Sequence, residues 1–177
     1  LVEAQARLEK ANLPIRLVFQ GHGSGWTPAR QLAESLGLRN IAWLPYAPEK
    51  ELADSLLARH VMVVTQKIAA QGLLWPSKLG LVMILPRPIV FVGPTSGSIA
   101  EELGRECGAK AFEPGDAVGL ANEIQKIYQC WPPKTVPEIR SAFTLSEAGN
   151  RWKKVLEEAL SSSTPRTVRL DAAESEQ

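Results

Sequence analysis

The sequence has little cysteine, almost no excess charge and no long apolar run. Only two of its 177 residues are cysteines, Cys107 and Cys130, and their spacing is not that of a metal site. A disulfide framework is therefore not expected, and a reducing compartment is favoured over secretion. The formal net charge of +1 gives no electrostatic case for a nucleic-acid partner or for a polybasic contact with a membrane.

No apolar stretch approaches the ~20 residues that a transmembrane helix needs. The chain opens with LVEAQARLEK, without an initiator Met or the pattern of a signal peptide. We therefore expect a piece of a longer protein. Its 45% hydrophobic residues are enough for the core of one domain.

Short β-branched runs alternate with helical patterns along the chain. Alternation of this length predicts an α/β fold with a Rossmann-like parallel sheet of five or six strands and helices on both faces. The predicted strands are 15–19, 41–44, 61–64, 89–92 and 109–112, and the later predicted helices include 49–57, 98–105, 117–128, 136–143 and 146–160. We expect one domain over residues 1–160 and a disordered C-terminal tail over 161–177.

The stretch WPSKLGLVMILPRPIVFV, residues 75–92, predicts a short helix followed by a buried strand. Pro76 suits the first turn, Ser77 can cap N–H groups there, and Lys78 adds a cation. The helix is apolar nearly all round, so we expect it to be buried. Because its start follows the preceding strand, it is a candidate anion site. A plain helix cap with a solvated lysine is an equally good interpretation.

A glycine loop, Gly21-His22-Gly23-Ser24-Gly25, follows the first predicted strand. Glycines there allow the backbone to approach a ligand closely and expose N–H groups. Trp26 occupies the place of the third glycine of a dinucleotide fingerprint, and no acidic residue ends the second strand, so NAD binding is disfavoured. Phosphate binding and a plain strand-to-helix turn both stay open.

Other chemistry-bearing residues have simpler interpretations. His22 could hydrogen-bond an anion or a sugar, although a loop histidine without a role is slightly favoured. His60 is interpreted as structural, and Trp75 either lines a base or sugar pocket or, as we prefer, packs in the core. The sequence shows no Ser/His/Asp order, no paired carboxylates in one loop and no metal cluster.

Four segments, taken in order, resemble a known family. LVFQGHG, IAWLPYAPEKELADSLLARHVMVV, WPSKLGLVMILPRPIVF and GAKAFEPGD look like the C-terminal half of a GT-B, family 4, retaining glycosyltransferase. The similarity covers roughly residues 15–128 and is greatest to the subgroup with Pro-Ser-Lys, whose members often serve bacterial surface polysaccharide synthesis. It implies a nucleotide-sugar donor as substrate, with no metal and no separate cofactor. By position it implies donor-binding roles for Gly21, His22, Gly23, Ser24, Tyr46, Ser77, Lys78 and Leu79, and it aligns Arg87-Pro88 with the family's Lys/Arg-Pro.

The chain departs from the family pattern at several positions. His22 stands where Asp is usual, Leu81 where many members have a Glu that contacts the donor ribose, and Pro86 where Gly is common. The family's upstream Arg and Lys would lie before Leu1, and the N-terminal acceptor half is missing. We therefore assign no catalytic residue and expect the isolated chain to bind donor weakly and to be inactive.

Two other functions fit the same resemblance. One is a non-catalytic, degenerate GT-B binding or scaffold domain, and the other is half of a GT-B nucleotide-sugar epimerase. Whichever of the three functions applies, we expect a cytoplasmic location. The alternative is a location at the inner face of the membrane, with a peripheral contact made through the parent protein.

Overall fold

The computed structural model describes residues 1–132 and 145–162, which belong to two units that we consider separately. The first unit holds all the strands of the described residues, and the second holds helix α7 (Leu145–Ser162). The predicted helix at 136–143 lies outside the described residues, as does the predicted tail apart from Ser161 and Ser162, which end α7. No helix in the described ranges is long and apolar enough to cross a membrane.

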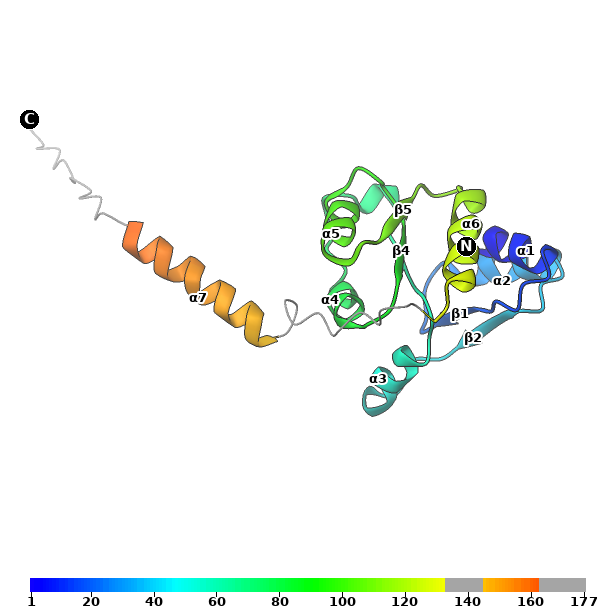
Figure 1. The fold of residues 1–177 in the computed structure, drawn as a ribbon, viewed down its shortest axis with the longest axis horizontal. Coiled ribbons are helices and arrows are strands. Elements are labelled where there is room, and N and C mark those ends of the chain that lie inside the picture. The colour runs from blue at the N-terminus through cyan, green and yellow to red at the C-terminus, as the bar shows by residue number, and fades with distance from the viewer. Residues whose placement is uncertain (133–144, 163–177) are drawn as a thin grey trace, which may run out of the picture. The chain divides into compact units, whose positions relative to one another are not determined.

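Strands and helices of the first unit alternate as predicted, and every strand pairing is parallel, which confirms the α/β Rossmann-like fold (Figure 1). In chain order the elements are α1 (Val2–Lys10), β1 (Leu17–Gln20), α2 (Trp26–Ser35), β2 (Ile41–Leu44), α3 (Glu49–Leu57), β3 (Met62–Thr65), the 3-10 helix η1 (Ile68–Ala70), α4 (Ser77–Ile84), β4 (Ile89–Val92), α5 (Ser98–Cys107), β5 (Lys110–Phe112) and α6 (Ala117–Gln129).

The five strands form two hydrogen-bonded groups, whereas we predicted one continuous sheet. β1 pairs with β2, with Leu17 opposite Ile41. β4 lies between β3 and β5, with Met62 opposite Ile89 and Val90 opposite Lys110. Within the described residues no ladder joins β1 to β3, so each of these strands has one open edge.

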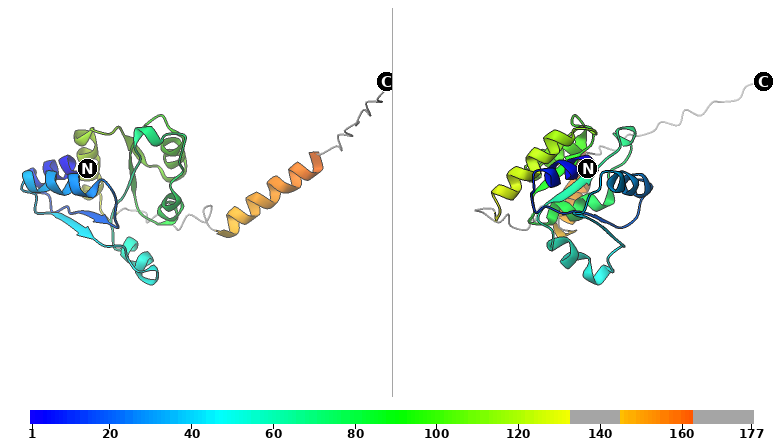
Figure 2. Two further views of the ribbon diagram at one scale, coloured as in Figure 1. Left: turned by 180° about the vertical axis from the view of Figure 1, so that it is seen from behind. Right: turned by 90° about the vertical axis from the view of Figure 1, so that its right-hand side faces the viewer.

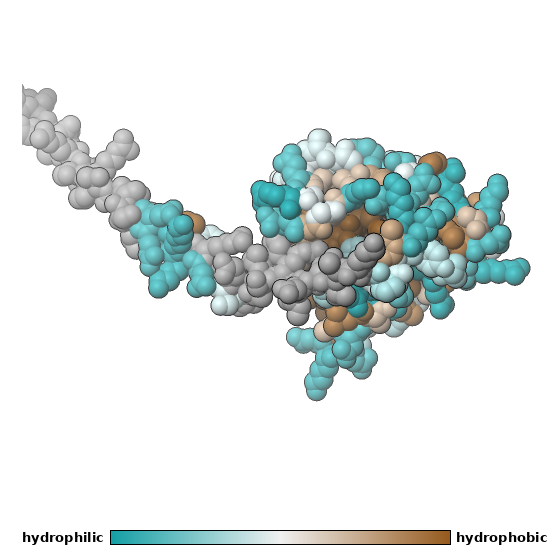
Figure 3. Space-filling view, in the orientation of Figure 1, coloured by the Kyte–Doolittle hydropathy of each residue, from teal (hydrophilic) through white to brown (hydrophobic). Residues whose placement is uncertain are grey.

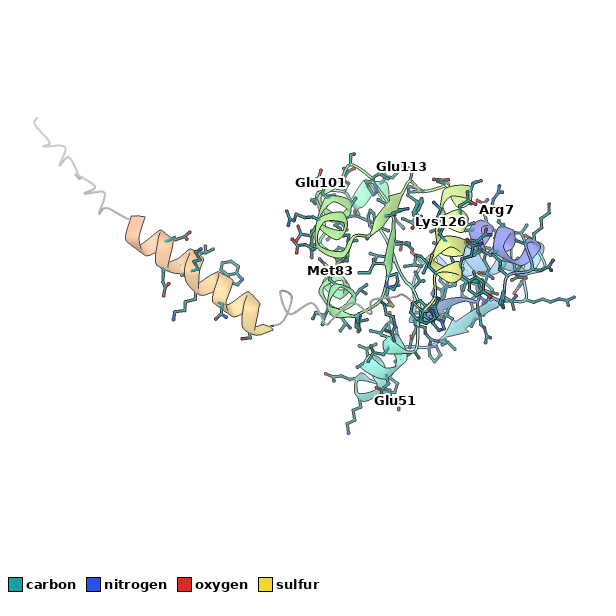
Figure 4. The ribbon with its side chains drawn as sticks, viewed as in Figure 1. Arg7, Glu51, Met83, Glu101, Glu113 and Lys126 are labelled. Carbon is teal, nitrogen blue, oxygen red and sulfur yellow. The ribbon has the colours of Figure 1, made fainter. Side chains whose placement is uncertain are left out.

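The core lies on both faces of β4. Val90 packs in a cluster with Ala4 and Leu8 of α1 and with Leu120 and Ala121 of α6. Figures 1 and 2 show α6 on one side of β4 and β5, and α4 and α5 on the other. Because side chains alternate along a strand, Phe91, which is 0% exposed, points to the opposite face from Val90. Met83 of α4, labelled in Figure 4, is also buried.

Two helix starts show what local sequence can and cannot predict. Asp116 has the residue type of an N-cap and does cap α6, because its Oδ1 accepts the backbone N–H of Gly119 at 2.8 Å. Thr27, followed by Pro28, also has the residue type of an N-cap, but α2 begins at Trp26 with Gly25 at its N-cap, so Thr27 lies inside the first turn.

Two burial expectations for the stretch 75–92 are wrong. Leu79 and Met83 are buried, but Leu81 of the same helix is 37% exposed. Trp75, for which we preferred core packing, is 53% exposed, next to the exposed Leu73 and Leu74. The loop before α4 therefore presents apolar side chains to solvent. Figure 3 shows that apolar residues also reach the surface in patches on the face that it draws.

Arg87 has a structural role beyond its match to the family pattern. Its Nε donates to the carbonyl of Arg59 at 2.7 Å and its Nη2 to that of Leu57 at 2.7 Å. Leu57 is the last residue of α3, so the guanidinium satisfies carbonyls at a helix end that otherwise lack partners.

We expect Arg87→Met to lower the free energy of unfolding by about 1–2 kcal/mol, because charged hydrogen bonds to two carbonyls at the end of α3 are lost. Arg16→Met, at an exposed arginine before β1, is the control and should change stability little. Urea unfolding of both variants measures the difference. An equal effect of the two substitutions would contradict a capping role for Arg87.

Candidate functional site

The loops that follow β1 and β2 meet at Gly21. The backbone N–H of Gly21 donates to the carbonyl of Leu44 at 3.0 Å, which extends the β1–β2 ladder by one bond. Gly21 has φ +106°, and a Cβ there would lie 2.9 Å from Cε1 of Tyr46. The hydroxyl of Tyr46 donates to the carbonyl of His22 at 3.3 Å. Only glycine suits this position, for both its backbone angle and its contact.

The rest of the glycine loop is open. Gly23, Ser24 and Gly25 are exposed, and a Cβ at Gly23 or Gly25 would meet no atom within 4 Å. The N–H of Gly23 donates to Nδ1 of His22 at 3.1 Å, and the exposed His22 ring stacks on Trp26 at 5.4 Å. A ligand that takes the Gly23 N–H must therefore first displace the His22 side chain.

The second group of predicted site residues lies at the start of α4. Ser77 and Lys78 are its first two residues, although their side chains lie outside the part of the chain that the structure describes. The N–H of Leu79 donates to the carbonyl of Pro76 at 2.9 Å, and the Leu79 side chain is 1% exposed. Leu79 therefore anchors the start of the helix in the core.

The structure brings Gly21, His22 and Tyr46 together directly. The two groups follow strands of different ladders, β1–β2 and β3–β4–β5. Their convergence on one cleft stays a prediction.

Sequence reasoning missed a link between the loops after β4 and β5. The backbone N–H and hydroxyl of Thr95 both donate to Oε1 of Glu113, at 2.9 and 2.5 Å. Glu113 lies beyond the end of β5 (Figure 4). No local pattern links Thr95 to Glu113, because the two residues lie 18 positions apart in the sequence.

The Thr95 hydroxyl, and with it the backbone N–H, lowers the pKa of Glu113. A carboxylate whose pKa is lower in the folded state stabilises the fold above its unfolded pKa, about 4.3, and this contribution is lost as the pH falls through the folded pKa. Glu113→Gln should therefore reduce Tm slightly at pH 7, and the difference from the parent chain should vanish near pH 3.

Melting curves from pH 7 to pH 3 test this expectation. Glu51→Gln, at an exposed position on α3 labelled in Figure 4, is the control for the loss of one negative charge. A Tm difference for Glu113→Gln that persists at pH 3 would show that the charge is not the cause.

Comparison with known proteins identifies the fold. No protein-family model and no curated protein matches the chain. The crystal structure of a glycosyltransferase from Rickettsia africae ESF-5 is similar to it, with a TM-score of 0.66 and 16% sequence identity. The match covers 92% of this chain and 44% of the other. The chain therefore has a glycosyltransferase-like fold and spans less than half the length of that relative.

Proposed function

We propose that this chain is the donor-binding half of a retaining GT-B glycosyltransferase. It would bind a nucleoside diphosphate sugar, while the acceptor is held by another part of the parent protein. The similarity in fold to a solved glycosyltransferase supports the general class of protein. The four sequence segments that resemble the family, in the same order along the chain, support the assignment to the donor-binding half. The isolated chain is expected to bind donor and to catalyse nothing.

The observation that carries the proposal is the turn of Gly21 beneath Tyr46. It follows β1, at the carboxyl edge where parallel α/β sheets bind ligands. The close contact between Gly21 and the Tyr46 ring orders the two loops, and the following glycines leave their backbone exposed. Exposed N–H groups of this kind, together with Lys78, would stabilise the negative charge that develops on a leaving diphosphate.

Nucleotide titration of the ¹⁵N-labelled chain, followed by NMR, tests the proposal. UDP, GDP and ADP should each be added up to about 10 mM, because affinity in the millimolar range is expected for half of a site. One of the three should shift the amide signals of Gly21, Gly23 and Ser77 more than those of α6. Shifts confined to other regions, or none with any nucleotide, would refute donor binding by this chain.

A non-catalytic scaffold domain is the second candidate. Leu81 favours it, because a leucine that is 37% exposed stands where the family's ribose-contacting Glu would be. Leu81→Glu separates the two functions. In a donor-binding domain this substitution should strengthen binding of the preferred nucleotide, whereas a scaffold should bind no nucleotide before or after it.

A further inference from the structure

The loop 66–76, between β3 and α4, is held closed by one side chain. Gln66, the first residue after β3, is half-buried, and its backbone N–H donates to the carbonyl of Val92 at 3.0 Å. Its Nε2 donates to the carbonyls of Ala70 and Leu74, at 3.1 and 3.3 Å. Both hydrogens of the carboxamide are therefore used, and the two bonds span most of the loop.

Burial contributes little to the shape of this loop. In the part of the chain that the structure describes, no side chain from Lys67 to Trp75 is buried. Leu73, Leu74 and Trp75 are 77%, 67% and 53% exposed. Because the loop removes little apolar surface from water, its order depends mostly on its hydrogen bonds.

The backbone hydrogen bonds within the loop are short in range. Ala70 donates to the carbonyl of Lys67 at 2.9 Å, and Leu73 and Leu74 donate to that of Ala70 at 3.2 and 3.4 Å. Each of these bonds closes a local turn. The bond from the Gln66 side chain to Leu74 spans eight positions, and it ties the end of the loop to the end of β3.

The loop after β4 lies against this loop. A Cβ at Gly93 would lie 3.0 Å from the carbonyl oxygen of Gln66, so glycine allows the two backbones to approach there. A Cβ at Gly97 would lie 3.4 Å from Nε2 of Gln71, so the Gln71 side chain packs against the N-cap residue of α5. The two loops thus touch at two points, and Gln66 is one of them.

The far end of the loop leads directly into α4. Leu74 lies two residues before Pro76, which is the N-cap residue of this helix. The N–H of Leu79 donates to the carbonyl of Pro76 at 2.9 Å, and the Leu79 side chain is 1% exposed. The start of α4 is therefore fixed on the helix side by the core and on the loop side by the bond from Gln66 to Leu74.

We propose that Gln66 is a positioning residue of the donor site. Its carboxamide holds the loop closed, and the closed loop places the backbone of Ser77 and Lys78 for the donor diphosphate. Loss of its two bonds would let the start of α4 move, and the donor would bind the closed fraction of the molecules. The inference rests on the proposed function and adds to it a residue that acts through the loop.

The test compares Gln66→Met with Gln71→Met. Methionine keeps the length of the side chain and adds no charge, but it removes both N–H donors. Gln71 is an exposed glutamine of the same loop that makes neither of the two bonds, so its substitution is the matched control. Tm, amide hydrogen exchange at Leu79 and nucleotide binding are measured in both variants and in the unchanged chain.

In Gln66→Met, exchange at Leu79 should become about tenfold faster relative to that at Phe91 of β4, because opening of the first turn of α4 becomes easier. Binding of the preferred nucleotide should weaken about fivefold to tenfold. The initial slope of the Gly21 amide shift against nucleotide concentration measures it without saturation. Tm should fall by a few degrees at most, since the loop buries little. Gln71→Met should match the unchanged chain in all three properties.

Faster exchange at Leu79 with unchanged nucleotide binding would overturn the proposal, because Gln66 would then have a structural role alone. Equal exchange in the two variants would overturn it too, as would a fall in Tm of about 10 °C or more, which would show that Gln66 supports the whole domain. Failure of the proposed function is a different result. In that case no nucleotide shifts the amide signals of the unchanged chain, and the role of Gln66 is refuted with it.

Discussion

Lys78→Ala is expected to weaken binding of the preferred nucleotide roughly tenfold to a hundredfold, since a hydrogen bond between charged groups contributes about 1.5–3 kcal/mol. Lys78 is the second residue of α4, at a helix start where backbone N–H groups already favour an anion. Alanine is an excellent helix former, so the substitution removes the cation and keeps the helix. Calorimetric or NMR titration of UDP, GDP and ADP measures the loss.

Two comparisons make the Lys78 experiment decisive. Lys50→Ala removes an exposed lysine on α3 and controls for a general change in net charge. Lys78→Arg keeps the charge but replaces a compact ammonium with a planar fork, so part of the affinity should return. Unchanged affinity in Lys78→Ala would leave this lysine as a solvated charge at a helix start.

Gly21→Val is expected to lower the free energy of unfolding by about 2–3 kcal/mol, because a β-branched residue is strained at positive φ. The φ of +106° is the main cause, and the new Cβ would also lie 2.9 Å from Cε1 of Tyr46. Nucleotide binding should be lost as well if the Gly21 turn orders the site. Urea unfolding and nucleotide titration of the same variant measure both effects.

Gly23→Ala is the matched control in the same loop. No atom lies within 4 Å of a Cβ there and its φ is not positive, so stability should change little. If the loop approaches the donor closely, Gly23→Ala should still weaken nucleotide binding. Tyr46→Ala combined with Gly21→Val removes the contact but not the backbone strain, so it should recover only part of the lost stability. Full recovery would show that the side-chain contact, and not φ, requires glycine.

Much of the fold could be predicted because its signals are local. The strand at Ile41–Leu44, the helix at Glu49–Leu57 and the strand at Ile89–Val92 occupy the predicted residues. A β-branched run, an N-terminal proline or an Asp cap acts within a few residues of itself, so no tertiary information is needed. The glycine loop after β1 was predicted for the same reason, because glycines mark a turn within a few residues of themselves.

Burial depends on which elements cover one another, and local patterns do not contain that information. Leu79 and Leu81 look alike in the sequence, yet Leu79 faces the core and Leu81 is exposed. Arg87 was aligned with the family's Lys/Arg-Pro by position, but its bonds to the end of α3 depend on residues 28 and 30 positions away.

The sequence by itself determined the class of fold, the sites of the turns and the residue types at each candidate ligand loop, because these follow from propensity and periodicity. Only the tertiary structure decided that Tyr46 covers Gly21, that Thr95 holds Glu113, and that the strands form two ladders. Each of these features joins segments far apart in the chain. Such contacts depend on how distant segments pack against one another, which no single stretch of sequence specifies.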